Sequence, residues 1–459
     1  MKVRDFQVRL PHRRVASEGR SETPSKEAIS TNRKQIRSDQ LLLYIIVCLA
    51  FVSQKQFLFA QSYTWDEIKN RFDAANPTLK ADALNVQEAK SQEITAYLRP
   101  NPQFNLSTDG TQLAPYNNHW IPLSGTQFSP NVSYLHERDH KRELRLQTAE
   151  QGAQIATFAH SDLERNLLFS LRSQFVQTLQ AKAVRALSRQ QLDYYDHIID
   201  ISRARFNSGD LAQIDLDRIE LQRVQYESDL QTAEVNLRTA KIQLLQLLND
   251  RTPVDQFDIA GSFESSDQLQ PLDTFRQIAV DTRPDLQAAL ESVRQADTNH
   301  KLAIANGSTD PTFAGWYTYN PSVNNPFAHQ TIGGSVSVPL RIFDRNQGEK
   351  QRTQLDIGRN QQLVEATRAQ MFSDVDSAYA EVNSNLVLIR PYKTKYLAQA
   401  SRVRETVTYA WQHGGASLMD FLNAQSDYRT VQLAYVQLIG SYMTAAGQLN
   451  LAVGREVIQ

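Results

Sequence analysis

The chain has 459 residues, of which 49 are Lys or Arg and 50 are Asp or Glu, and it has a single cysteine. One cysteine excludes an intramolecular disulfide and any zinc or redox centre built on several cysteines. Without residues 1–60, 38 basic and 45 acidic residues remain, a net charge of −7. This balance argues against a nucleic-acid-binding protein, which would carry a clustered basic face. Only 17 Gly and 16 Pro interrupt the chain, which predicts few and long elements.

Residues 1–60 have the pattern of a leader and signal peptide. A basic stretch at 33–37 precedes an apolar run at 41–52, and Ala60 ends a sequence suited to cleavage. The twelve apolar residues are too few for a transmembrane anchor, since a helix needs about 20 to cross the hydrocarbon. A lipoprotein is disfavoured because Val47, rather than a small residue, precedes Cys48. We therefore expect export through the inner membrane.

From residue 61 onward, one order of signals occurs twice. The first copy occupies 61–250 and the second 274–459, joined by a connector at 251–273 that mixes Pro, Gly, Ser and acidic residues. Equivalent residues are separated by 205 to 209 positions: Pro77 and Pro284, Pro102 and Pro311, Gly209 and Gly414, Asp215 and Asp420. A duplication that keeps its register over this length indicates two copies of one structural unit, arranged about an axis.

Each copy is expected to contain a helix, two strands and a long helical hairpin. In the first copy, Asn76-Pro77 starts a helix and 103–107 alternates as a strand. Residues 139–207 hold one glycine and no proline, which predicts a helix of about 100 Å. Gly209 then reverses the chain into a second helix at 211–248, so the two helices form an αα hairpin.

The second copy follows the same plan. Its expected elements are a helix starting at Arg283-Pro284, strands at 313–319 and 334–338, an outgoing helix at 349–412 and a return helix at 417–453. Pro391 lies inside the outgoing helix, where it removes a hydrogen bond and is expected to kink or break the helix.

The long helices carry narrow apolar stripes. The predicted stripe of the first return helix consists of Val224, Leu230, Val235, Leu237, Ile242, Leu245 and Leu248. A narrow stripe packs against partner helices and leaves much of the helix in contact with water.

The four strands are too few to close a barrel within one chain. Strands from several chains are expected to complete one closed transmembrane barrel, because closure leaves no unpaired sheet edge in lipid. A soluble four-stranded cap is the alternative.

Three segments carry a resemblance to a known family. They are 205–210 (RFNSGD), 409–425 (YAWQHGGASLMDFLNAQ) and 336–348 (VSVPLRIFDRNQG). Over residues 62–454 the chain resembles the TolC family of outer-membrane efflux channels. The third segment, where a strand ending at Pro339 is followed by Phe343, Asp344, Arg345, Asn346 and Gly348 at a helix start, resembles the CzcC-like branch, which serves heavy-metal cation efflux. Lys141 and Arg142 occupy the corresponding helix start of the first copy, with His140 in place of a glycine.

The resemblance implies a mainly α fold with a small β part. Three chains would form a homotrimer, with a twelve-stranded barrel in outer-membrane lipid and a long α-helical barrel in the periplasm. It also implies two partners, a periplasmic adaptor protein and an RND-type pump of the inner membrane, and no cofactor. The adaptor would dock at the hairpin tips, which are Gly209, Asp210, Gly414 and Gly415.

By the same resemblance, Asp215, Asp420 and Asn423 would line the channel aperture just beyond the tips. Three copies of an aspartate would form an acidic constriction that concentrates cations and repels anions. Asn423 is neutral and weakens such a ring, and Arg218 stands at its equivalent in the first copy. The alternative is that both aspartates are helix-start carboxylates favoured by the helix dipole.

One motif points to a different class of protein. Residues 136–140 read HERDH, which matches the H-E-x-x-H pattern of zinc peptidases. No third ligand stands out and the second copy lacks the motif, so we interpret the match as accidental. No catalytic nucleophile or phosphate-binding loop is evident, and the sequence predicts a non-enzyme. Drug efflux, type I protein secretion and an exported coiled-coil scaffold remain as alternatives to metal efflux.

Overall fold

The computed structural model describes residues 61–266, 268–320 and 329–458. The predicted leader and signal peptide at 1–60 lies outside the described residues, and residues 60–459 form one compact unit. This unit is mainly helical and contains one four-stranded antiparallel sheet. None of the helices among the described residues combines the length and hydropathy needed to cross a lipid bilayer.

The same order of elements occurs in both halves of this unit, which confirms the predicted internal duplication. The first half contains α2 (Trp65–Ala75), α3 (Pro77–Tyr97), β2 (Gln103–Asp109), β3 (Gln127–Leu135), α4 (Lys141–Asn207) and α5 (Gln213–Leu247). The second contains α6 (Leu272–Thr282), α7 (Pro284–Asn306), β5 (Thr312–Tyr319), β6 (Gln330–Ser337), α8 (Gln347–Pro391), α9 (Leu397–Gln412) and α10 (Leu418–Val453).

Local sequence accounts for where the helices begin. Pro77 and Pro284 each occupy the first turn of a helix, where a missing N–H costs no hydrogen bond. Asn76 caps α3, since its side-chain oxygen accepts hydrogen bonds from the backbone of Thr78 at 2.9 Å and Leu79 at 3.1 Å. His140 precedes α4 with a φ of +56°, so the helix begins two residues later than predicted. That left-handed backbone suits the glycine that His140 replaces.

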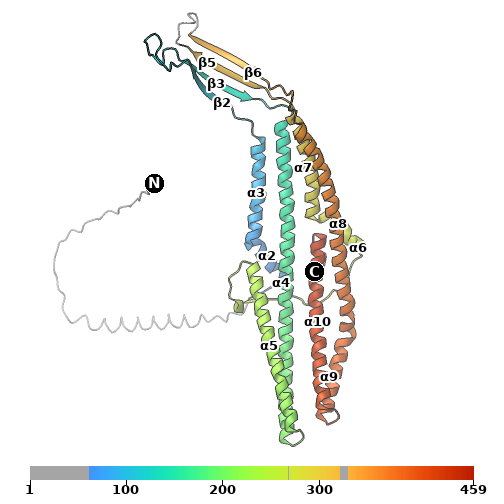
Figure 1. The fold of residues 1–459 in the computed structure, drawn as a ribbon. Coiled ribbons are helices and arrows are strands. Elements are labelled where there is room, and N and C mark those ends of the chain that lie inside the picture. The colour runs from blue at the N-terminus through green and yellow to red at the C-terminus, as the bar shows by residue number, and fades with distance from the viewer. Residues whose placement is uncertain (1–60, 267, 321–328, 459) are drawn as a thin grey trace, which may run out of the picture. The chain divides into compact units, whose positions relative to one another are not determined.

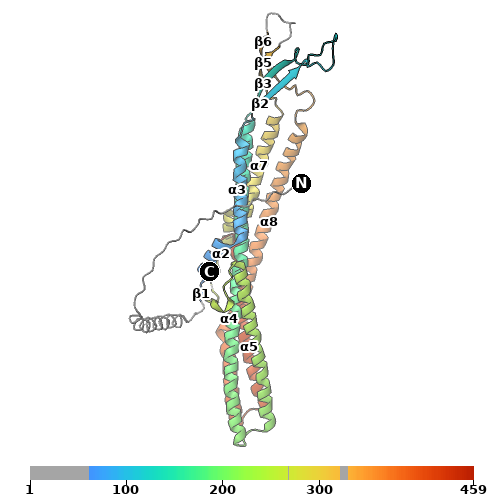
Figure 2. The same ribbon diagram turned by 90° about the vertical axis from the view of Figure 1, so that its left-hand side faces the viewer.

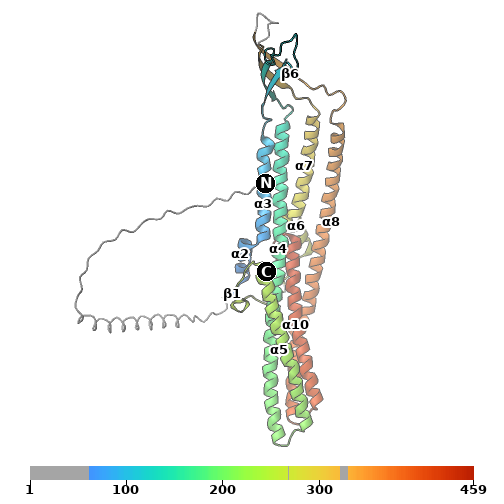
Figure 3. The same cartoon turned by 60° about the vertical axis from the view of Figure 1, so that its left-hand side comes forward.

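The helices lie side by side in two sets of four (Figures 1 and 3). In the half nearer the sheet, the order is α3, α4, α7 and α8, and in the other half α5, α4, α10 and α9. Helix α4 belongs to both sets because its 67 residues extend for about 100 Å. The sheet and the two hairpin turns therefore lie at opposite ends of the helices (Figures 1 and 2).

The sheet has the strand order β2-β3-β5-β6 and two different faces. One face exposes Phe104, Leu106, Phe128, Val132, Phe313, Tyr317, Tyr319, Ile332 and Val336. The other carries Trp316 and mainly small or polar side chains, among which the hydroxyls of Ser129 and Thr318 lie 3.1 Å apart. Among the described residues, strands β2 and β6 each pair with one strand only, so both edges of the sheet are open.

Two features of the fold differ from the sequence predictions. The connector contains β4 (Phe257–Ile259), which pairs in parallel with β1 (Gln61–Tyr63) and is too short to show an alternating pattern. The predicted stripe of α5 is also buried only in part within the single chain. Leu230, Leu245 and Leu248 are buried, whereas Val224, Val235 and Ile242 are 50–62% exposed in the single chain.

The outgoing helix of the second half is interrupted where Pro391 was expected to disturb it. Helix α8 ends at Pro391, and a π-helical turn, η2 (Tyr392–Tyr396), leads into α9. Proline lacks the N–H that would complete the α-helical ladder, and a π-turn is one way to absorb that loss.

Candidate functional site

The two hairpin turns lie at the same end of the molecule and are exposed (Figure 1). Gly209 has a φ of +84° and Gly414 a φ of +78°, a backbone conformation that favours glycine. The turns close through backbone hydrogen bonds from Asp210 to Arg205 at 2.8 Å and from Gly415 to Ala410 at 2.7 Å. The four predicted tip residues therefore come together as two adjacent, solvent-facing loops.

Asp420 lies in the exposed first turn of α10 and is held by Ser417. The Ser417 hydroxyl donates to the Asp420 carboxylate at 2.7 Å and accepts from the Asp420 backbone N–H at 3.1 Å. The hydroxyl of Ser417, and its backbone N–H, which donates to the same carboxylate at 3.2 Å, lower the pKa of Asp420 below its usual value of 3.8. Asn423 is exposed one turn further along. The carboxylate thus remains charged and serves as part of a helix cap.

Asp215, the equivalent residue of the first copy, has a different environment. Its carboxylate is half-buried and lies 3.9 Å from the guanidinium of Arg218. An opposing charge at this distance partly offsets the field of Asp215. The two predicted aperture aspartates are therefore equivalent in sequence but not in electrostatic effect.

A cluster beside the tips, which the sequence did not single out, joins the two hairpins. Arg205 of α4 donates to the backbone oxygen of Trp411 at 3.2 Å, and its guanidinium lies 5.1 Å from the centre of the indole ring. Trp411 stacks on Phe421, with ring centres 4.5 Å apart. Both rings are buried, in a core cluster shared by α4, α5, α9 and α10. In the sequence, the signal that could have pointed to this cluster is the pair of aromatic residues, Trp411 and Phe421, on either side of the turn.

A second set of contacts joins the hairpins further from the tips. The guanidinium of Arg404 lies between the rings of Tyr194, at 4.9 Å, and Tyr428, at 3.9 Å. Arg429 of α10 forms an ion pair with Asp229 of α5. Cations over aromatic faces and ion pairs both stabilise such contacts. Together with the aromatic cluster, they hold the second hairpin against the first.

The predicted strand–helix junction anchors the sheet to the helices. The ammonium group of Lys141 is buried and donates to Asp310 at 2.7 Å and to the backbone oxygen of Ser308 at 3.2 Å. Burial is the largest single influence on the pKa of Asp310 and raises it, but the hydrogen bonds from Lys141 and the Arg138 backbone, with the charges of Lys141 and Arg341, together lower the pKa below its usual value. Asn346 donates to the backbone oxygen of Ala303 at 2.8 Å. These contacts tie the segments before α4 and α8 to the end of α7 and the segment that follows it.

The remaining junction residues are on the surface. Arg142 pairs with Glu143 at 2.8 Å and lies over the ring of Tyr97. Pro339, Phe343, Asp344, Arg345 and Gly348 are exposed. Phe343 is 90% exposed, so part of this segment presents an apolar surface in the single chain.

The HERDH segment does not have the geometry of a zinc site. It lies between β3 and α4 rather than on a helix, so its two imidazoles are not held one turn apart on a common face. Glu137, the would-be general base, forms a two-point ion pair with Arg145. Among the described residues, no group of three or more His, Cys, Asp or Glu side chains is placed to hold a metal ion.

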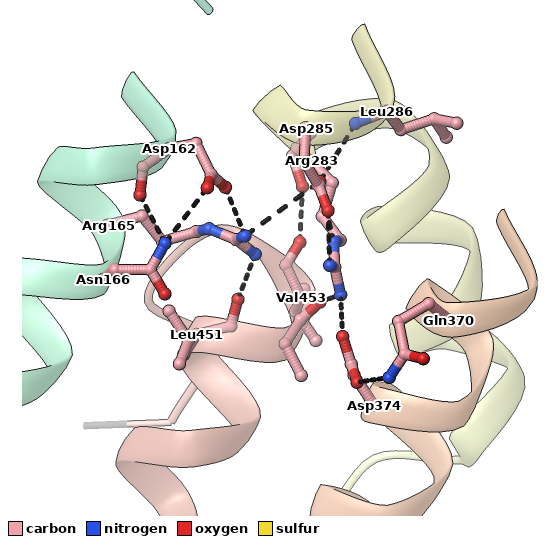
Figure 4. Close-up of polar contacts among 12 residues, drawn as sticks. Asp162, Arg165, Asn166, Arg283, Asp285, Leu286, Gln370, Asp374, Leu451 and Val453 are labelled. Atoms are coloured by element: carbon pink, nitrogen blue, oxygen red, sulfur yellow. Dashed lines mark hydrogen bonds and ion pairs between the residues drawn. The ribbon is translucent and has the colours of Figure 1, made fainter. Parts of the chain in front are cut away.

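A buried polar network lies where α10 ends against α7 (Figure 4). Arg283 donates to Asp285 at 2.6 Å, to Asp374 at 2.9 Å and to the backbone oxygen of Ala452 at 3.2 Å. Arg165 of α4 pairs with Asp162 and donates to the backbone oxygen of Leu451 at 2.7 Å. The last carbonyls of a helix have no partner within it and carry partial negative charge, so two arginines satisfy them here.

Comparison with known proteins identifies the family. The family model described as "Outer membrane efflux protein" matches residues 70–250 and 276–455. TolC of Escherichia coli is 23% identical, with 82% of this chain and 79% of TolC covered. The cobalt-zinc-cadmium resistance protein CzcC of Cupriavidus metallidurans is 21% identical, with 83% of this chain and 87% of CzcC covered.

Solved structures support the same fold. CusC has a TM-score of 0.71 at 18% identity, covering 84% of this chain and 91% of CusC. The CmeC channel of Campylobacter jejuni has a TM-score of 0.68 at 14% identity, covering 86% of this chain and 87% of CmeC. Members of this family are non-enzymatic conduits. The family match therefore excludes the interpretations of the chain as a zinc peptidase or a coiled-coil scaffold. The chain belongs to the outer membrane efflux protein family, and it is an outer-membrane efflux channel of the TolC type.

Proposed function

We propose that this channel works as a homotrimer that exports heavy-metal cations from an inner-membrane pump to the exterior. The two-faced sheet with open edges carries the first part of this proposal. An exposed apolar face suits lipid, and a polar face suits a water-filled interior. Joining β6 of one chain to β2 of the next closes twelve strands from three chains and leaves no edge.

The helices offer a second contact for neighbouring chains. Helix α5 exposes Ile214, Leu221, Val235 and Ile242, which follow a seven-residue spacing, together with Val224. A stripe with this spacing is typical of a helix that packs along another helix. In the trimer, a helix of the neighbouring chain would cover it.

The proposed partners follow from the ends of the molecule. The exposed tips at Gly209, Asp210, Gly414 and Gly415 are the surface for a periplasmic adaptor. No nucleotide-binding motif is present in the sequence, so the energy for export would come from the inner-membrane pump, of RND type.

Support for cations as substrate comes from two observations. The VPLRIFDRNQG segment resembles the metal-efflux branch, and CzcC, whose name refers to cobalt, zinc and cadmium resistance, is among the relatives. The charged, exposed Asp420 would give three negative charges at the aperture. Drug efflux or type I protein secretion is the second candidate, because TolC matches at similar identity.

Deletion of the gene tests the substrate. The deletion strain should become sensitive to cobalt, zinc or cadmium salts and should keep its resistance to a panel of drugs and dyes. Complementation with the unaltered chain should restore growth on metal. Sensitivity to drugs alone, with unchanged growth on metal salts, would establish the second candidate instead.

A further inference from the structure

A cavity of about 650 Å³ lies between α2, α4 and α10, roughly midway along the helices. Its wall combines apolar side chains, such as Trp65, Phe169 and Leu451, with charged groups that include Lys69 and Arg172. Pockets of this volume with mixed walls are typical of sites for small organic molecules. The cavity is separate from the tips, the aperture residues and the strand–helix junction.

Two arginines of α4 reach this cavity but have different partners. Arg165 and Arg172 are seven residues apart, so they lie on the same face of the helix. Arg165 is engaged by Asp162 and by the end of α10 (Figure 4). Arg172 has neither a hydrogen bond nor an ion pair among the described residues, and its recorded partner is the ring of Trp65, 4.6 Å away.

The acidic residues near Arg172 do not neutralise it by direct contact. Glu456 accepts a hydrogen bond from the indole N–H of Trp65 at 3.4 Å, and Asp66 is exposed at the rim. Burial lowers the pKa of Arg172, and the carboxylates of Glu456 and Asp66, which act on it without direct contact, offset this effect only in part. An arginine desolvated in this way is stabilised by an anion that satisfies its free N–H groups.

We propose that this cavity binds a small organic carboxylate with an apolar body, and that Arg172 pairs with its carboxylate. The planar guanidinium presents two parallel N–H donors, which match the two oxygens of a carboxylate. Trp65 orients the guanidinium by stacking, and Lys69 supplies a second positive charge. The apolar body packs on Phe169 of α4 and Leu451 of α10, which both line the cavity.

Binding to the purified trimer in an uncharged detergent tests this proposal. The probes are octanoate and N-acetyl-Leu-Leu, which carry the same carboxylate on a fatty chain and on a peptide, and octanamide, their neutral control. Isothermal titration should give binding of at least one carboxylate and at least tenfold weaker binding of octanamide. Octanoate alone would identify an aliphatic acid, and the dipeptide alone a peptide terminus.

The variant Arg172→Met keeps the apolar stem and removes the charge, and it should weaken carboxylate binding at least tenfold. Arg185→Met, on an exposed arginine of the same helix, is the control and should bind like the unaltered chain. Gly447→Leu tests the cavity without changing Arg172. A Cβ at this position would lie 3.6 Å from Arg172 and 3.7 Å from Phe169, so the larger side chain would begin to fill the cavity. Undiminished binding in both Arg172→Met and Gly447→Leu, equal binding of octanamide, or no binding to the unaltered trimer would overturn the proposal.

Discussion

Arg283 is 4% exposed and bonds two carboxylates and a helix end, so it is the most heavily committed side chain of the α10–α7 junction. We expect Arg283→Met to cost about 2–3 kcal/mol, because the partly buried carboxylates of Asp285 and Asp374 and the Ala452 carbonyl would lose their charged hydrogen-bond partner. Thermal unfolding of the purified protein measures the loss. Arg276→Met, which removes an exposed pair with Asp376, is the control and should change the melting temperature little.

Arg283→Met should also reverse the way in which the contribution of Asp285 to stability depends on pH. Burial is the largest single influence on the pKa of Asp285 and raises it, but the hydrogen bond and charge of Arg283, the charge of Arg165 and the backbone N–H of Leu286 together outweigh burial, so the net pKa is below 3.8. Its contribution to stability is therefore present above pH of about 4 and is lost as pH falls through the folded value. Without Arg283, burial dominates and raises the pKa. Melting temperatures at pH 5 and pH 7.5 should then show a smaller deficit for Arg283→Met at the lower pH; an equal deficit at both would contradict this account.

At the scale of elements, Phe421 ties α10 to the rest of the tip. It is fully buried against Trp411, and truncation of such a ring costs about 3–5 kcal/mol. We expect Phe421→Ala to loosen the second hairpin locally, so limited proteolysis should cut near Gly414 faster while the sheet end stays protected. Tyr409→Ala removes an exposed ring of the same turn and should leave the cutting rate unchanged.

Those same elements show what the sequence does and does not predict. The hairpins follow from Gly209, Gly414 and the long stretches without proline, and the strands from alternation, because these signals are local. The contacts that position the hairpins are not local. Arg165 meets Leu451 across 286 residues and Arg205 meets Trp411 across 206, and a single sequence carries no pattern for such pairs. The parallel pair of β1 and β4 is likewise non-local, and each strand has only three residues, too few to show an alternating pattern.

For the whole molecule, the exposed stripe of α5 gives a test of assembly. Val235→Asp places a charge on the stripe, and burying it in a chain–chain contact without a partner is strongly unfavourable. We expect loss of the heat-modifiable trimer on electrophoresis. Asn236→Asp adds the same charge at the adjacent exposed position and should leave the trimer intact. A normal trimer from Val235→Asp would remove this stripe from the proposed interface.

Charge at the proposed aperture would also be a property of the assembled channel. In planar bilayers the unaltered trimer should prefer cations, and Asp420→Asn should reduce this preference and weaken block by multivalent cations. Since the pKa of Asp420 is lowered by Ser417, the preference should persist down to about pH 4. Asp217→Asn changes an exposed aspartate of α5 and is the control. Anion preference in the unaltered channel would be incompatible with an acidic gate.

The break at Pro391 makes the two hairpins mechanically unequal. Helix α4 runs through 67 residues without a change of helix type, so a displacement at its tip is transmitted along its full length as in a stiff beam. The outgoing arm of the second hairpin, formed by α8 and α9, contains the π-turn η2, where the α-helical hydrogen-bond ladder is interrupted. Bending concentrates at the most compliant point. In a ring of six such hairpins, the three that contain α4 would therefore be stiff along their whole length, and the alternate three would bend at η2.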